Sequence, residues 1–90
     1  MTGIGLRAAD SVHAREFDGE LVILDMERGE YFALDEIGAR YWAAIESDSS
    51  EEALLDEIVS EYDVTREQAS ADLRALRDEL LERRLVVPKE

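Results

Sequence analysis

Histidine and cysteine, which often serve as catalytic base and nucleophile, are scarce in this sequence, and its carboxylates are too abundant to mark a catalytic pair. His13 is its single histidine, and cysteine is absent. His13 lies near Asp10 and Ser11 in the chain, but a catalytic triad is defined by geometry in space, which sequence adjacency does not supply. Gly3 and Gly5 do not begin a strand-to-helix turn of the phosphate-binding kind. We therefore predict that the protein is not an enzyme, has no catalytic residues and binds no cofactor.

Carboxylates are abundant, but their spacing does not favour a metal site. The acidic run over residues 46–52 lacks the alternating ligands and the central glycine of an EF-hand loop. The absence of cysteine also removes thiolate ligands for zinc and any disulfide, which is compatible with a reducing compartment. We expect no bound metal.

The net charge of −13 restricts the class of partner. Residues 65–84 hold five arginines and five acidic residues, whereas residues 1–64 hold four arginines and 17 acidic residues. DNA binding gains much of its affinity from counterion release, which requires clustered basic side chains. A chain this acidic repels nucleic acids and anionic membranes at long range. We therefore expect neither as a partner.

No stretch of the sequence resembles a membrane-directing segment. Residues 1–10 lack the apolar run of a signal peptide. The longest aliphatic run, residues 21–24, is far too short to span a bilayer. We expect a cytoplasmic protein.

The first half of the chain predicts three short strands. Residues 12–17 and 20–26 are separated by Asp18-Gly19, a pair typical of a type I′ hairpin turn. A second turn at residues 27–29 leads to a short strand at residues 30–34, which is enriched in aromatic residues. The pattern indicates an antiparallel meander.

The second half predicts three helices, each with apolar residues at helical spacing. Asp35 is a suitable N-cap for the first helix. Ser49 with Glu52, and Thr65 with Gln68, form capping boxes for the second and third helices. The predicted fold class is α+β, with a three-stranded antiparallel sheet followed by three helices in one domain spanning residues 1–90 and a core over about residues 12–87.

Several short motifs, in this order, resemble a known family. They are Tyr31-Phe32-Ala33-Leu34-Asp35-Glu36, Tyr41-Trp42, Tyr62-Asp63-Val64, Ala71-Asp72-Leu73 and Leu85-Val86. Their order and spacing are similar to those of the PqqD-like proteins, also called RiPP recognition elements. The third strand commonly ends in Leu-Asn in that family, whereas Leu34-Asp35 stands here and keeps the capping chemistry. The chain looks most like the stand-alone leader-binding proteins of lasso-peptide clusters.

This resemblance implies a winged helix-turn-helix fold that binds the leader of a ribosomally made precursor peptide. The leader would add as a strand to the third strand and lie against the third helix, and the other partners would be a cysteine leader peptidase and an ATP-dependent macrocyclase. A strand at a sheet edge offers the unpaired backbone groups that this mode requires. The expected peptide-binding residues are Glu30, Tyr31, Phe32, Ala33, Leu34, Ala69, Asp72, Leu73, Leu76 and Arg77.

Two points stay open at this stage. Tyr31 and Ala33 project to one face of the third strand and Phe32 and Leu34 to the other, and the pattern does not decide which face lines a cleft. Residues 51–84 also have a helix-turn-helix outline with Arg66 at the start of a DNA-recognition helix. The acidic turns argue against DNA, but DNA binding and a generic protein-interaction module remain as alternatives.

Overall fold

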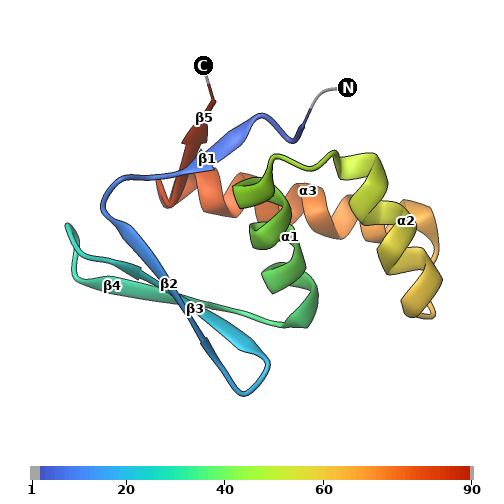
Figure 1. The fold of residues 1–90 in the computed structure, drawn as a ribbon, viewed down its shortest axis with the longest axis horizontal. Coiled ribbons are helices and arrows are strands. Elements are labelled where there is room, and N and C mark those ends of the chain that lie inside the picture. The colour runs from blue at the N-terminus through green and yellow to red at the C-terminus, as the bar shows by residue number, and fades with distance from the viewer. Residues whose placement is uncertain (1–2, 90) are drawn as a thin grey trace.

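The computed structural model describes residues 3–89 and has the expected α+β architecture (Figure 1). The three helices lie together beside a three-stranded meander, and a second, two-stranded sheet joins segments from the two ends of the chain. The elements in order are β1 (Leu6–Ala8), β2 (Val12–Phe17), β3 (Glu20–Asp25), β4 (Glu30–Leu34), α1 (Glu36–Ser47), α2 (Glu51–Glu61), α3 (Arg66–Glu82) and β5 (Val86–Pro88).

The antiparallel sheet β2-β3-β4 is the meander predicted from the sequence. Its first hairpin turns at Asp18 and Gly19, whose φ angles of 47° and 83° are those that a type I′ turn requires. Phe17 of β2 lies opposite Glu20 of β3, and Leu21 of β3 lies opposite Leu34 of β4. β3 is thus paired on both sides. β4, the third strand of the meander, is therefore an edge strand.

The second sheet, in which β1 pairs with β5, was not predicted. Leu6 lies opposite Pro88 and Ala8 opposite Val86. Leu6 and Val86 are 2% and 1% exposed, so this small sheet closes one end of the core. Each strand has only three residues, too few for an alternating pattern to be recognised, and the pairing joins distant parts of the chain.

Two of the three predicted N-cap residues are confirmed, although the reciprocal bond that would complete a capping box at Gln68 is not present among residues 3–89. The Asp35 carboxylate accepts a hydrogen bond from the Gly38 amide at 2.8 Å, and the Thr65 hydroxyl accepts one from the Gln68 amide at 3.0 Å. These caps satisfy amides that have no partner within their own helices.

The predicted cap of α2 was wrong by one residue. Ser50, not Ser49, is the N-cap, and its hydroxyl accepts a hydrogen bond from the Ala53 amide at 3.1 Å. The Ser49 amide donates to the Ala44 carbonyl at 2.9 Å, so Ser49 belongs to the end of α1 instead. Either serine hydroxyl could cap a helix. Ser50 does so because the Ser49 backbone is already engaged at the end of α1.

α3 ends at Glu82, and Arg83 and Arg84 follow its last turn. The amide of Arg84 donates to Leu81 and the amide of Leu85 to Leu80, both at 3.0 Å. These two bonds form a Schellman motif, which places Arg84 in the left-handed region with φ of 61°.

α1 lies at the centre of the fold and contributes the largest buried side chains. Tyr41 and Trp42 are 0% and 2% exposed and pack with residues of both sheets and the other helices. Burial raises the pKa of the Tyr41 hydroxyl to about 12. In the part of the chain that the structure describes, no helix has the length and apolar character needed to cross a membrane.

Candidate functional site

β4 presents a free backbone edge. Within residues 3–89 its only strand partner is β3. The two-residue turn after Phe17 makes Phe17 and Glu20 a hydrogen-bonded pair, and such pairs alternate along an antiparallel ladder. Carried through β3 to β4, this alternation directs the N–H and C=O groups of Tyr31 and Ala33 away from β3. These two residues therefore supply the ladder groups available at the edge.

The two faces of β4 differ in burial, which resolves the point that the sequence left open. Leu34 is 4% exposed and Phe32 is half-buried, so both face the helices. Tyr31 is 71% exposed and Ala33 is also exposed, so both lie on the outer face of the sheet.

A cleft of about 480 Å³ lies between β4, the start of α1 and α3. Gly38 makes the floor compact, because a Cβ at this position would lie 3.0 Å from the Leu34 Cβ. The half-buried Leu76 and the outer atoms of Leu73 supply apolar surface from α3. The lining residues are Glu20, Phe32, Ala33, Leu34, Asp35, Ile37, Gly38, Asp72, Leu73 and Leu76.

The cleft brings together the predicted binding residues Phe32, Ala33, Leu34, Asp72, Leu73 and Leu76. Glu30 and Tyr31 lie on the same strand but outside the lining, Ala69 is buried in the core at 4% exposure, and the exposed Arg77 does not line the cleft. The lining residues that the sequence reasoning missed are Glu20, Asp35, Ile37 and Gly38. Of these, only Gly38 carries a sequence signal, since glycine is unfavourable inside a helix and so indicates close packing.

The charged residues lining this cleft are all acidic. Glu20, Asp35 and Asp72 border it, and no basic side chain does. The Asp35 carboxylate is engaged as the cap of α1. Within residues 3–89, Glu20 and Asp72 form no ion pair. This end of the cleft is therefore negative.

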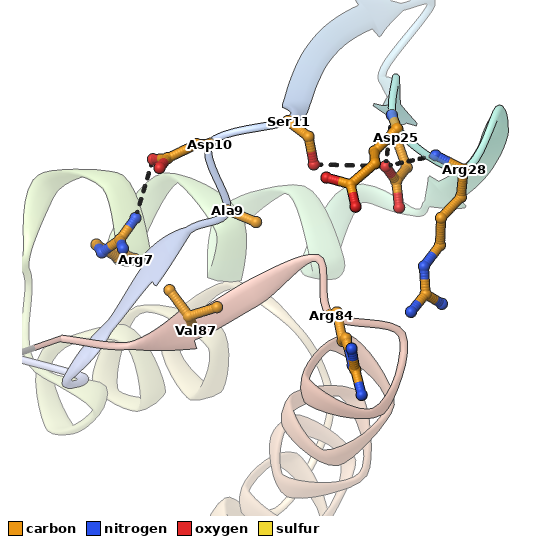
Figure 2. A pocket seen from close by; sticks show the side chains of 9 residues that line it. Arg7, Ala9, Asp10, Ser11, Asp25, Arg28, Arg84 and Val87 are labelled. Atoms are coloured by element: carbon orange, nitrogen blue, oxygen red, sulfur yellow. Dashed lines mark hydrogen bonds and ion pairs between the residues drawn. The ribbon is translucent and has the colours of Figure 1, made fainter.

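The opposite end, near the start of β4, carries basic residues. The Arg83 guanidinium lies over the Phe32 ring, 4.7 Å from its centroid, and donates to Glu79 at 3.3 Å. Beyond it is a polar hollow of about 280 Å³ bounded by the β1–β2 connection, the β3–β4 turn and the residues after α3 (Figure 2). Its lining is Arg7, Ala9, Asp10, Ser11, Asp25, Glu27, Arg28, Arg84 and Val87.

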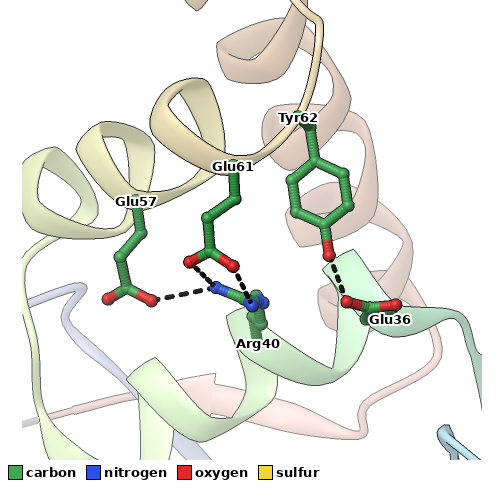
Figure 3. A network of polar contacts seen from close by, with 5 residues as sticks. All are labelled: Glu36, Arg40, Glu57, Glu61 and Tyr62. Atoms are coloured by element: carbon green, nitrogen blue, oxygen red, sulfur yellow. Dashed lines mark hydrogen bonds and ion pairs between the residues drawn. The ribbon is translucent and has the colours of Figure 1, made fainter.

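A separate polar network joins α1 to α2 (Figure 3). Arg40 contacts Glu57 at 3.0 Å and Glu61 at 2.8 Å, and the hydroxyl of Tyr62 donates to Glu36. The hydrogen bond from Arg40 lowers the pKa of Glu61, and the hydrogen bond to Glu36 raises the pKa of Tyr62. The network ties the two helices together on the side away from β4.

Arg66, the side chain on which DNA recognition would depend, is already occupied. Its guanidinium contacts Asp56 at 2.6 Å and Glu52 at 2.7 Å, both on α2. The hydrogen bond with Asp56 is the main cause of its raised pKa. A guanidinium held by two carboxylates is not free to neutralise a phosphate or to read a base, so this surface does not favour DNA binding.

The features of the cleft are those of a peptide-binding surface. A backbone edge lies beside an apolar floor, acidic side chains border the cleft, and arginines lie beyond it near the start of β4. His13 is exposed on β2 and lines neither hollow. Across residues 3–89, no three carboxylate or imidazole side chains are grouped as metal ligands.

Comparisons with known proteins point in the same direction. The family model described as coenzyme PQQ synthesis protein D (PqqD) matches residues 20–86. A solved structure described as TbiB1 in complex with the TbiA(beta) leader peptide is 34% identical, with a TM-score of 0.80, and the match covers 89% of this chain and 93% of that one. A lasso peptide synthetase B1 complexed with the leader peptide is 27% identical, with a TM-score of 0.86 and coverage of 93% and 99%. A comparison with curated proteins finds no match.

Proposed function

This chain belongs to the PqqD family, and we propose that it binds the leader segment of a ribosomally made precursor peptide. Recognition elements of this family are non-catalytic peptide-binding modules. The observation that carries the proposal is the free edge of β4 beside an apolar cleft. Leader peptides are the ligands named for both similar solved structures.

The binding mode that we propose is addition of the leader as an antiparallel strand along β4. The backbone groups of Tyr31 and Ala33 would form the ladder, each bond contributing a net stabilisation of about 0.5–1.5 kcal/mol. Alternate leader side chains would point inward onto Leu34 and Leu76, where apolar burial contributes about 25 cal/mol per Å². These two contributions oppose the entropy lost when a flexible leader becomes ordered.

The adaptor role extends the proposal to processing enzymes. The family resemblance suggests a cysteine leader peptidase and an ATP-dependent macrocyclase as partners. Holding the leader by one segment raises the effective concentration of the adjacent cleavage site for an enzyme bound to the same complex. The chain itself would then contribute affinity and position, and the partner enzymes the chemistry.

Leader binding is tested by fluorescence anisotropy with the labelled synthetic leader of the precursor encoded beside this chain. A scrambled leader and a duplex DNA of similar length are the controls. We expect saturable binding of the leader alone, with a dissociation constant below about 1 μM. Absence of leader binding by protein shown to be folded by circular dichroism would overturn the proposal.

Strand addition is tested separately with Ala33→Pro. Proline removes the outward N–H and places its ring at the edge, so leader affinity should fall by about tenfold or more. The matched control is Ala14→Pro, because the same alternation directs the N–H of Ala14 to the free edge of β2 on the opposite side of the sheet. Unchanged affinity in folded Ala33→Pro would exclude strand addition along β4 while leaving leader binding itself intact.

A further inference from the structure

Arg28 and Arg84 border the polar hollow, and neither is paired with a carboxylate among residues 3–89. In this acidic chain, Arg7, Arg40, Arg66, Arg83 and Lys89 each form an ion pair. Arg28 and Arg84 form none with any residue between 3 and 89, and the same holds for the exposed Arg15, Arg74 and Arg77, which lie outside the hollow. Both residues line the hollow, Arg28 from the β3–β4 turn and Arg84 from the segment that follows α3 (Figure 2).

The hollow is lined by three arginines and three acidic residues, and none of these acids forms an ion pair with Arg28 or Arg84. Asp10 pairs with Arg7 at 3.2 Å. The buried Asp25 caps the β3–β4 turn by accepting the amides of Glu27 at 3.1 Å and Arg28 at 3.2 Å. Glu27 is exposed and forms no ion pair with the described residues. Two guanidinium groups thus remain available at one site.

The backbone at Arg84 supplies an independent observation. Arg84 is the left-handed residue of the Schellman motif that ends α3, with φ of 61°. Glycine is preferred at this position because it has no Cβ to clash with the backbone. Asp18 and Asp48 also adopt positive φ, but Asp tolerates this region better than Arg does, so the conformation of Arg84 motivates the hypothesis of a functional side chain.

The direction of α3 places these arginines relative to a bound leader. Leu76 and Asp72 share the cleft with Leu34, whereas Arg83 lies over Phe32, so α3 runs antiparallel to β4. A leader antiparallel to β4 would leave the edge beside Glu30. The β3–β4 turn with Arg28, and the end of α3 with Arg84, lie at this exit.

We propose that Arg28 and Arg84 form a subsite for a carboxylate side chain of the leader, located just C-terminal to the residues that pair with β4. The inference rests on the proposed leader binding. Guanidinium groups bind carboxylates through directed, charge-assisted hydrogen bonds, and the hollow of about 280 Å³ admits an aspartate or glutamate side chain. The acidic residues Glu20 and Asp72 at the entry end and the arginines at the exit would together favour one orientation of the leader.

Arg84→Gly separates a binding role from a structural one. Glycine relieves the left-handed strain, so the melting temperature should rise by about 3–6 °C. Leader affinity, measured by anisotropy, should nevertheless fall by about fivefold, with a similar fall for Arg28→Gln. Arg15→Gln and Arg74→Gln are the matched controls, since both arginines are exposed, form no ion pair with residues 3–89 and lie away from the hollow.

Substitutions in the leader provide the reciprocal test of the proposed subsite. Changing the Asp and Glu residues that follow its pairing segment to Asn and Gln should weaken binding to the unmodified protein by about fivefold and should leave binding to Arg84→Gly unchanged. A leader without a carboxylate in that stretch, or full affinity in Arg84→Gly and Arg28→Gln, would overturn the subsite while leader binding stands. Failure of the unmodified, folded protein to bind any leader would instead overturn both proposals.

Discussion

The α1–α2 face and the β4–α3 face of this molecule use charged residues in opposite ways. On the α1–α2 face, Arg40 is held by Glu57 and Glu61, and the neighbouring Arg66 bridges α2 and α3 through Glu52 and Asp56. On the β4–α3 face, Asp72 of the cleft and Arg84 of the polar hollow form no ion pair within residues 3–89. On one face the arginines are paired with carboxylates of the protein itself, whereas on the other these charged side chains face solvent.

This difference separates charges that hold helices together from charges that are available to a partner. A satisfied guanidinium contributes to the relative position of two helices and has little left for a ligand. An unsatisfied one is hydrated in the free protein and gains a partner on binding. Sequence composition alone treats all of these side chains alike, so the contrast exists only in the structure.

The largest expected effect comes from placing a charge inside the cleft. Leu76→Glu puts a carboxylate where an apolar leader side chain would pack, so leader affinity should fall by more than about tenfold. Leu81→Glu is the matched control, because Leu81 is also a half-buried leucine of α3 but does not line the cleft. Equal loss of affinity in the two folded variants, measured by anisotropy, would argue against a specific cleft.

A smaller effect, on stability alone, is expected on the opposite face. Arg40→Met leaves Glu57 and Glu61 close together without their shared cation, so the melting temperature should fall modestly. Leader affinity should not change, because Arg40 does not line the cleft. Arg74→Met serves as the control for loss of one exposed positive charge. A drop in leader affinity in Arg40→Met would contradict the assignment of a structural role to the α1–α2 face and of leader binding to the β4–α3 face.

The same network predicts a pH dependence of stability. The hydrogen bond from Arg40 lowers the pKa of Glu61 below its ordinary value of 4.5. A carboxylate with a lowered folded-state pKa stabilises the fold above the unfolded-state pKa and loses this contribution as pH falls through the folded-state value. Thermal melts of Glu61→Gln should therefore show a shallower loss of stability below pH 4.5 than the unmodified protein. Glu67→Gln, which alters an exposed glutamate outside the network, should leave that slope unchanged.

The smallest expected effect is at Arg66. Arg66→Gln removes the contacts to Glu52 and Asp56 but leaves the cleft intact, so leader affinity should stay within about twofold of the original value. Electrophoretic mobility shift with duplex DNA should give no complex for either protein. A DNA complex that is lost in Arg66→Gln would restore the DNA-binding alternative.

Local patterns in the sequence were sufficient for much of this fold. The Asp18-Gly19 turn, the edge strand at residues 30–34 and the caps at Asp35 and Thr65 depend on neighbours within a few residues, and the structure confirms them. The pairing of β1 with β5 escaped prediction because it depends on contacts between distant segments.

The candidate site was predictable to a similar extent. Residues 32–34 and Asp72, Leu73 and Leu76 were expected as binding residues, and they line one cleft. Glu20 was missed because it reaches the cleft only through the register between β3 and β4. Arg28 and Arg84, which we propose as a subsite, were not expected, because their lack of carboxylate partners within residues 3–89 is a property of the folded molecule.

The pairing of β1 with β5 has a consequence for the order of folding during synthesis. The hairpins and helices can form as each segment leaves the ribosome, but Leu6 has no strand to pair with until Val86 to Pro88 have been made. Until then the end of the core that Leu6 and Val86 fill stays open to water. Nascent chains that stop before residue 86 should therefore remain loosely packed and susceptible to proteolysis, with native packing reached only when the small sheet closes.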